Sequence, residues 1–386
     1  MTPGARVAAA IEILDSLGEG VPAEQALTRW ARNNRFAGSK DRAAIRDHVF
    51  DVLRCRRTAE HFGKGATGRA LMIGLLHQQG ADLNALFDGK GHAPAPLNEL
   101  ETAYPEPPSD TGTRLNLPDW LLADFEVSLG NDADRTAHAL QSRAPVTLRV
   151  NLAKSDRATV AGMLRDAGVE TIPNPLSGAA LTIIDGARKF RNSVVYTEGY
   201  ADLQDAASQA VVASLPPGGT VLDYCAGGGG KALALAMDPT RQVFAHDIAP
   251  QRMADLPVRA ARAGATVRQL AGETLSENAP FDVVLCDAPC SGSGAWRRAA
   301  EGKWTLTPER LVMLTQMQDE ILDTAAPLVR QGGLLAYATC SVLQTENEAR
   351  VEAFLARNSG WTLASSQRFA VDDNGDGFFT AHLTAA

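Results

Sequence analysis

The sequence contains few cysteines and no long apolar run. None of its segments approaches the roughly 18 uninterrupted apolar residues of a membrane-spanning helix, and charged residues interrupt the N-terminal stretch that would have to form the apolar part of an export signal. The five cysteines form no Cys-x-x-Cys pair, and an odd number in a chain of 386 residues argues against a disulfide framework. We therefore expect reduced thiols in a cytoplasmic protein that does not bind membranes.

Metal-ligand spacing and internal repeats are also missing. The seven histidines are scattered, so we predict no metal site.

The net charge of -8 argues against a nucleic-acid partner for the chain as a whole. Residues 29–57, however, carry nine Lys/Arg and three Asp/Glu. Such a run is more often a solvated helix face, but it is also the candidate RNA-contacting surface of this chain.

Composition divides the chain into four predicted parts. Apolar residues recur at helical spacing in residues 1–79, which predicts an all-α domain. Residues 80–117 are rich in Gly, Pro, Asp and Asn and predict a linker with one short helix at most. Residues 118–200 predict a small α+β domain of a size that suits substrate positioning, and residues 201–386 predict a larger α/β domain.

The C-terminal part, residues 201–386, alternates strands and helices, which predicts an α/β fold with a doubly wound, mostly parallel sheet. Its expected strands are 220–224, 242–246, 281–286 and 334–337, and its expected helices are 231–237 and 307–330. In the middle domain we expect strands at 146–150, 181–184 and 194–196, and helices at 120–129 and 158–167.

A glycine-rich loop follows the first strand of the C-terminal domain. Four glycines, Gly227 to Gly230, lead straight into a helix, which exposes backbone N–H groups at a positive helix start and lets a ligand approach closely. Asp247 lies 20 residues beyond Gly227, where a carboxylate can accept hydrogen bonds from ribose hydroxyls. These features predict a nucleoside-bearing cofactor. The loop also satisfies a loose G-x-G-x-x-A pattern, so a dinucleotide cofactor remains an alternative. It lacks the sequence pattern of a phosphate-binding loop.

Two thiols follow apolar strands, Cys290 in DAPCSGSG and Cys340 in ATCS. A single cysteine is more often an inert, buried residue, but two at strand ends beside a nucleoside site favour chemistry. Asp287 could accept a hydrogen bond from the exocyclic amine of cytosine. The segment WRRAAEGKW at 296–304 mixes basic and aromatic residues that suit RNA backbone contact and base stacking, although surface and core packing is the commoner reason for such a mixture.

Four motifs together resemble the Sun family of RNA 5-methylcytosine methyltransferases, and most closely its RsmB-type 16S rRNA enzymes. They are Cys225 to Lys231, DAPCSG at 287–292, ATCS at 338–341 and ENE at 346–348. The likeness is strong from residue 203 to 383 and looser in the middle domain, through WLL at 120–122 and LRVN at 148–151. The N-terminal stretch 39–54 looks like the NusB-like RNA-binding domain of such enzymes.

The resemblance implies a Rossmann-like domain that binds S-adenosylmethionine. It implies cofactor-binding roles for Cys225, Ala226, Gly227, Gly228, Gly229, Gly230, Lys231, Asp247, Glu273 and Asp287. The family usually reads Cys-Ala-Ala-Pro-Gly-Gly-Lys, so Gly227 and Gly228 replace Ala and Pro here, which loosens the loop without removing a hydrogen-bond donor. Glu273 is the only acid near the position expected to contact adenine.

The resemblance also assigns the catalytic roles. Cys340 would attack carbon 6 of a flipped-out cytosine, and Cys290 would assist removal of the carbon 5 proton and release of the product. Asp287 would hold the cytosine ring, with Lys231 near the cofactor or the base. Covalent addition divides one difficult step into easier ones, and the base must leave its stack to be reached.

We therefore predict a monomeric, cytoplasmic enzyme that methylates carbon 5 of a cytosine in RNA, with 16S rRNA as the expected substrate. The same chemistry on tRNA or another RNA is an alternative. Three other classes of protein are alternatives to this enzyme: an NAD-dependent dehydrogenase, a non-catalytic RNA-binding or assembly factor, and a DNA cytosine methyltransferase.

Overall fold

The computed structural model describes residues 1–385, which divide into two compact units. The first, called here the helical unit, comprises Met1–Glu126, Asn131–Arg143 and Trp296–Thr305. The second, called the α/β unit, comprises Val127–Gly130, Ala144–Ala295 and residues 306–385. Within residues 1–385 no helix has the length and apolar character needed to cross a membrane.

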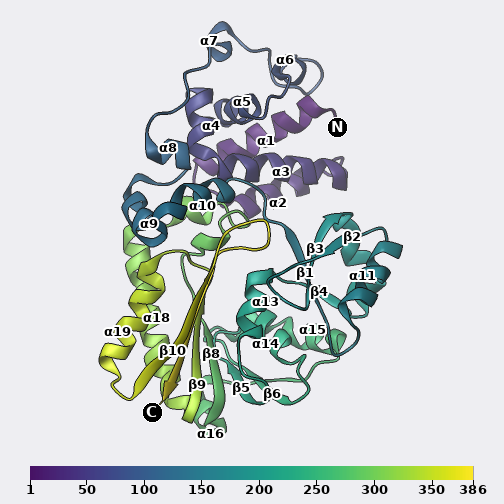
Figure 1. Cartoon of the computed structure of the whole chain (residues 1–386). Helices are drawn as coiled ribbons and strands as arrows, with labels where there is room; N and C mark the ends of the chain where they lie inside the picture. The colour runs from purple at the N-terminus through teal and green to yellow at the C-terminus, as the bar shows by residue number, and fades with distance from the viewer. Residues whose placement is uncertain (386) are drawn as a thin grey trace. The chain divides into compact units, whose positions relative to one another are not determined.

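Five helices form the main body of the helical unit (Figure 1). They are α1 (Pro3–Gly18), α2 (Ala23–Asn33), α3 (Ser39–Arg54), α4 (Arg56–Gly63) and α5 (Gly68–Gln78). Their apolar faces meet in one core that includes Val7, Ile13, Ile45, Val49, Leu71 and Ile73. Burial of these faces at helical spacing is what stabilises helices of this length.

Shorter helices complete the helical part of the chain. The stretch 80–117 contains three of them, where at most one was expected: α6 (Leu83–Leu86), α7 (Glu99–Thr102) and α8 (Thr111–Leu115). Each begins after an Asp or Asn whose side chain caps it, and this polar composition is also what predicted a linker. The remaining helices are α9 (Leu122–Leu129), α10 (Ala133–Leu140) and α17 (Gly302–Thr305).

The first part of the α/β unit is a small antiparallel sheet with strand order β2-β3-β1-β4. Its strands are β1 (Val146–Val150), β2 (Glu170–Pro173), β3 (Ala180–Asp185) and β4 (Ala201–Leu203), and its helices are α11 (Arg157–Asp166) and α12 (Val194–Thr197). The strand expected at 194–196 is wrong, because these residues form α12. Two adjacent valines favoured a strand, but only Val195 is buried, and the Glu198 N–H closes a helical turn onto the Val194 carbonyl at 2.9 Å.

The second part is a seven-stranded sheet with strand order β10-β11-β9-β8-β5-β6-β7. Strands β9, β8, β5, β6 and β7 run parallel to one another. At one edge β11 pairs antiparallel with β9, and β10 pairs antiparallel with β11. The strands are β5 (Gly219–Asp223), β6 (Arg241–Ala245), β7 (Val267–Gln269), β8 (Phe281–Asp287), β9 (Val329–Thr339), β10 (Trp361–Phe369) and β11 (Phe378–Ala385). The predicted α/β fold with a mostly parallel sheet is confirmed.

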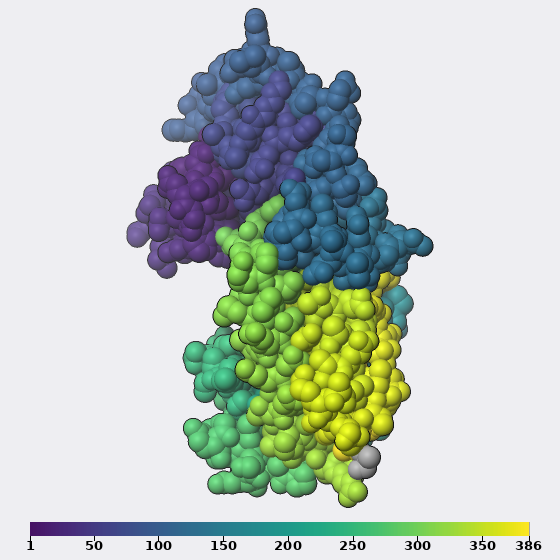
Figure 2. Space-filling view, turned by 90° about the vertical axis from the view of Figure 1, so that its left-hand side faces the viewer, coloured from purple at the N-terminus to yellow at the C-terminus, as the bar shows by residue number. Residues whose placement is uncertain are grey.

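Separate apolar clusters cover the two faces of this sheet. The helices of this part are α13 (Ala206–Ala213), α14 (Gly230–Leu235), α15 (Leu256–Ala263), α16 (Leu275–Asn278), α18 (Pro308–Ala325) and α19 (Glu348–Arg357). Helices α18 and α19 lie side by side, joined by the Arg350–Asp319 ion pair at 2.7 Å, and Figure 2 shows the C-terminal residues in light green and yellow as one continuous surface of this unit.

The helix expected at 307–330 ends early. Thr307 caps α18, but the helix stops at Ala325 and β9 already begins at Val329. Pro327 lies between them and cannot continue the α-helical hydrogen bonding. Residues 329 and 330, expected at the end of the helix, therefore lie in the strand.

Candidate active site

The glycine-rich loop connects β5 to α14 at the carboxyl edge of the parallel sheet. Gly229 is the residue before the helix, has φ +75°, and donates its N–H to the Ala226 carbonyl at 2.8 Å. A Cβ atom at Gly229 would lie 2.4 Å from Leu256 Cδ1. Both the backbone conformation and the close approach of Leu256 therefore require glycine at this position.

Asp247 holds this loop from the end of the neighbouring strand β6. Its side chain is buried, and one carboxylate oxygen accepts the Gly227 N–H at 2.8 Å and lies 3.2 Å from Arg252 Nη1. The other oxygen accepts the Ala249 N–H at 2.9 Å. Asp247 thus fixes the loop and lines the adjoining cavity as well.

The two thiols meet at the ends of two adjacent strands. Cys290 follows β8 and Cys340 follows β9, and these parallel strands pair in a register that places Asp287 opposite Ala338. The two Sγ atoms are 3.5 Å apart. Two motifs that lie 50 residues apart in the chain therefore form one site.

The buried Lys231 and the partly exposed Asp287 form an ion pair beside the thiols. Lys231 Nζ lies 2.7 Å from the Asp287 carboxylate and 5.1 Å from the centre of the Phe378 ring. Burial alone would lower the pKa of Lys231, but the charge of Asp287 and the hydrogen bond to it raise that pKa above its usual value, with smaller contributions from Asp223 and Cys340. Lys231 is therefore a fixed cation at this site.

A buried carboxylate lies on the other side, against the loop that carries Cys290. Glu346 is completely buried and accepts the Ser291 N–H at 2.7 Å and the Gln318 side-chain amide at 3.1 Å. The hydrogen bond with Cys340 and burial raise the pKa of Cys290 well above its usual value, and the charges of Cys340 and Glu346 add to the effect.

A further buried carboxylate, Asp223, ends strand β5. Burial raises its pKa to about 7, and the charge of Asp287 is the next largest cause. Within residues 1–385 neither carboxylate oxygen of Asp223 has a hydrogen-bond partner. This carboxyl group is consequently close to half-protonated at neutral pH.

A cavity of ≈730 Å³ opens between these elements, a volume that suits a nucleoside-sized ligand. Most of the predicted site residues line it: Cys225, Ala226, Gly227, Gly228, Gly230, Lys231, Asp247, Asp287, Cys290 and Cys340. Gly229 and Glu273 are not among the described residues that line it. Gly229 turns the chain into α14, and Glu273 is exposed in a short helical turn, Gly272–Thr274.

Other lining residues had no recognisable signal in the sequence. Ile248 follows Asp247 and is 93% exposed, an unusual environment for an isoleucine that only the structure reveals. Helix α18 contributes Met317, Ile321 and Thr324. The other additional lining residues are Gln204, Ser208, Tyr224, His246, Arg252, Ala288, Pro289 and Glu320.

Among residues 1–385 there is no group of three or more His, Cys, Asp and Glu that could hold a metal ion.

The basic and aromatic segment 296–304 packs into the helical unit. Trp296, Arg297 and Lys303 are buried, and Lys303 Nζ donates to the Arg54 carbonyl at 3.0 Å. Trp304 Nε1 donates to the Leu53 carbonyl at 2.6 Å, and burial lowers the pKa of Lys303 to about 7. The packing alternative is therefore correct for these residues, and the base-stacking interpretation is wrong.

The fold and the site together define a Rossmann-like methyltransferase domain with two thiols at one edge of its sheet. Residues 210–384 match the family model described as 16S rRNA methyltransferase RsmB/F, and residues 117–188 match the ferredoxin-like domain of the RsmF/B-like methyltransferases. The chain belongs to the RsmB/F family, which confirms the resemblance found in its motifs.

Two curated relatives illustrate the similarity. The chain is 35% identical over 303 residues to ribosomal RNA small subunit methyltransferase B of Salmonella arizonae, covering 74% of this chain and 68% of that protein. It is also 35% identical over 283 residues to the protein of the same name from Photorhabdus laumondii, covering 69% and 66%. The chain thus spans about two thirds of the length of the curated relatives that it matches.

Solved structures show the same fold at lower identity. The crystal structure of PH0851 covers 100% of this chain and 99% of its own, with a TM-score of 0.77 and 24% identity. A methyltransferase homolog protein from Pyrococcus horikoshii covers 71% of this chain and 97% of its own, with a TM-score of 0.63 and 23% identity. The predicted Rossmann-like class is confirmed by these likenesses.

Proposed function

We propose that this chain transfers a methyl group from S-adenosylmethionine to carbon 5 of a cytosine in RNA, with 16S rRNA as the substrate, through a covalent adduct with Cys340. The observation that carries the proposal is the pair of thiols, 3.5 Å apart, beside the Lys231–Asp287 ion pair. The names of the curated relatives support RNA of the small ribosomal subunit as the substrate class.

The cavity beside the glycine-rich loop suits the cofactor. Gly228 and Gly230 would approach its amino-acid part at the positive start of α14, and Asp247 and Ile248 would hold its nucleoside. When bound, S-adenosylmethionine supplies an electrophilic methyl group. The exposed Ile248 side chain offers an apolar face that a planar base would cover.

The charges around the thiols support the order of their roles. Cys340 and Lys231 line the same cavity, where the positive charge of Lys231 would stabilise the negative charge that develops as sulfur adds to carbon 6. Asp287 would hold the cytosine at its N3 and exocyclic amine. Carbon 5 then becomes nucleophilic, takes the methyl group, and must lose its proton before the bond from sulfur to carbon 6 can break.

Cys290 suits that second half of the reaction. The hydrogen bond with Cys340 is the largest cause of its raised pKa. Cys290 Sγ lies 3.5 Å from Cys340 Sγ and lines the same cavity, so it would lie beside a cytosine bonded to Cys340. We assign it the removal of the carbon 5 proton that precedes release of the product.

The helical unit offers a smaller RNA-contacting surface than the sequence suggested. Five of the nine cations in residues 29–57 are bound within the unit, for example Arg46 to Glu24 and Arg57 to Asp119. The exposed side chains of Arg29, Arg32, Arg35 and Lys40 have no hydrogen bond or ion pair within residues 1–385, and Phe36 beside them is 73% exposed. These four cations and Phe36 are the proposed contact with RNA.

Transfer of tritium from methyl-labelled S-adenosylmethionine to unmodified 16S rRNA tests the proposal, with tRNA and duplex DNA as competing substrates. We expect label in 16S rRNA and one site that resists bisulfite conversion. Cys55→Ala, in the helical unit, is the control cysteine variant and should transfer label normally. Binding of NAD in place of S-adenosylmethionine, or absence of label from every RNA, would contradict the proposal.

A further inference from the structure

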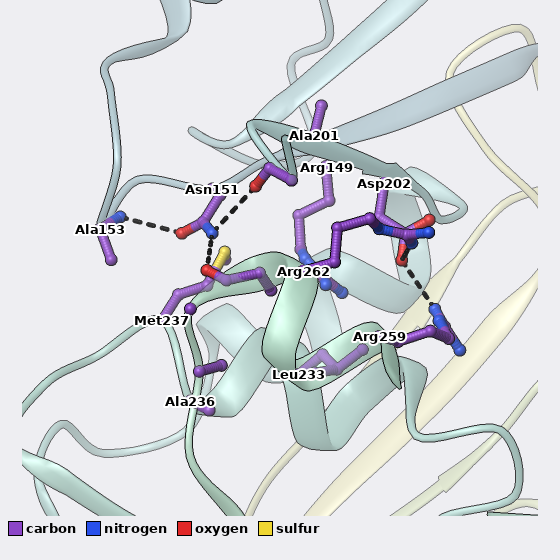
Figure 3. Close-up of a pocket in the computed structure, with 14 residues that line it drawn as sticks. Arg149, Asn151, Ala153, Ala201, Asp202, Leu233, Ala236, Met237, Arg259 and Arg262 are labelled. Atoms are coloured by element: carbon purple, nitrogen blue, oxygen red, sulfur yellow. Dashed lines mark hydrogen bonds and ion pairs between the residues drawn. The ribbon is translucent and has the colours of Figure 1, made fainter. Parts of the chain in front are cut away.

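Three arginines line a small hollow that is separate from the ligand cavity. Arg149, Arg259 and Arg262 lie around Asp202 (Figure 3). The hollow has a volume of ≈20 Å³, enough for about one water molecule and too small for a ligand. None of the three arginines is among the described residues that line the ligand cavity.

Arg149 reaches the loop from strand β1. It is buried, its Nη1 donates to the Gly230 carbonyl at 2.7 Å, and it also donates to the Gln204 side-chain oxygen. Gln204 in turn donates to the Ser208 hydroxyl at 3.3 Å, and both of these residues line the ligand cavity. Burial lowers the pKa of Arg149 to about 10, so it stays a cation at neutral pH.

Arg259 reaches the same loop from helix α15. It donates to the Gly228 carbonyl, and its Nη2 lies 2.9 Å from the Asp202 carboxylate. Asp202 is also the β4 residue that pairs with Arg149 across the small sheet. Arg262, on the same helix, lies 3.4 Å from Asp202 but packs over the Tyr196 ring and makes no hydrogen bond to the loop within the described chain.

We infer that Arg149 and Arg259 are positioning residues that hold the glycine-rich loop in its ligand-binding conformation by donating hydrogen bonds to the Gly230 and Gly228 carbonyls. Four consecutive glycines lose more conformational freedom on ordering than other residues do. Charge-assisted hydrogen bonds to two of their carbonyls preform the loop, so that less of this freedom is lost when the cofactor binds. The inference rests on the proposed function, because it assigns a cofactor to this loop.

Calorimetric titration of the full chain with S-adenosylmethionine tests this inference without an activity assay. We expect Arg259→Met to raise the dissociation constant about tenfold or more, with the midpoint of thermal unfolding nearly unchanged. Arg262→Met is the matched control, because Arg262 also pairs with Asp202 but does not bind the loop in the described part of the chain. It should change the dissociation constant less than about twofold. Arg259→Lys, which keeps the charge and one donor, should retain most of the affinity.

A rescue variant separates loop ordering from general destabilisation. Gly228 does not have a positive φ, and a Cβ atom there would lie 3.5 Å from Arg259 Nη1, an ordinary contact. Alanine at Gly228 narrows the freedom of the unbound loop, so Gly228→Ala should recover part of the affinity lost in Arg259→Met.

The outcomes distinguish this inference from the proposed function. Wild-type protein that does not bind S-adenosylmethionine would overturn both. Wild-type protein that binds it, with Arg259→Met binding equally well or Arg262→Met losing as much affinity, would overturn the inference alone.

Discussion

The loop after β8 and the loop after β9 each present a cysteine to the same cavity, yet their surroundings have opposite character. The loop with Cys290 is bound to the buried carboxylate of Glu346 through the backbone N–H and hydroxyl of Ser291. The loop with Cys340 is bound to the neutral amide of Asn347, which contacts the Thr339 hydroxyl and the Ser341 carbonyl.

Glu346 and Asn347, which are adjacent in the ENE motif, therefore bind the two cysteine loops. Glu346 binds the Cys290 loop through a carboxylate, and Asn347 binds the Cys340 loop through a neutral amide. Lys231 adds a cation on the Cys340 side. The difference teaches that the roles of two identical side chains can be set by the charge of the group that holds each loop.

The largest expected effect on methyl transfer comes from removing the thiol of Cys340. Cys340→Ala should lower methyl transfer by at least about 10³-fold, because no covalent bond to carbon 6 can then activate carbon 5. Tritium transfer to 16S rRNA measures this, beside Cys55→Ala as the control. Activity within tenfold of the wild type would contradict the assignment of Cys340.

Removing the cation tests why Cys340 is the nucleophile. Lys231→Met should lower the single-turnover rate roughly 10²-fold at pH 7, because it leaves Asp287 unpaired and the thiolate unassisted. Part of this loss should be recovered at pH 9, where more of the thiol ionises. A loss that is the same at both pH values would show that Lys231 does not act through the thiol.

Removing the charge of Glu346, or adding a charge at Asn347, should reduce the difference in alkylation rate between Cys340 and Cys290. In the wild type we expect iodoacetamide to alkylate Cys340 about tenfold faster than Cys290. Glu346→Gln should speed alkylation of Cys290, and Asn347→Asp should slow alkylation of Cys340. Peptide mass spectrometry after timed quenching measures both rates, and unchanged ratios in both variants would contradict the electrostatic comparison.

The sequence predicted the strands and the motifs at their ends, and it predicted that two cysteines share a site. It could not order their roles without the family resemblance, because the fold, not the local sequence, brings Glu346 to Ser291 and Lys231 to Asp287. Ile248 escaped prediction for a similar reason, since an exposed isoleucine looks in sequence like any core residue.

The errors in secondary structure also have a physical origin. Residues 194–196 carry two valines, and their β preference is overridden by the burial of Val195 in a single helical turn. The segment 296–304 looked suited to RNA because composition alone cannot show that Lys303 is buried among backbone carbonyls.

The smallest expected effect concerns a buried carboxylate that belongs to neither thiol loop. The folded-state pKa of Asp223 is raised to about 7 from 3.8, so the folded protein binds a proton that the unfolded chain releases, and stability falls as the pH rises through this interval. Asp223→Asn removes this loss. Urea unfolding should show the variant gaining stability relative to the wild type between pH 5 and pH 8, with the ratio of alkylation rates unchanged. A constant difference across this pH range would contradict the assignment.

The central claim is that Cys340 makes the covalent bond and Cys290 helps to undo it. Denaturing gel electrophoresis of each variant after incubation with S-adenosylmethionine and labelled 16S rRNA tests it most directly. Cys290→Ala should accumulate a protein–RNA adduct that survives denaturation, whereas Cys340→Ala and the double variant should accumulate none. An adduct that accumulates in Cys340→Ala and not in Cys290→Ala would contradict the account and exchange the two roles.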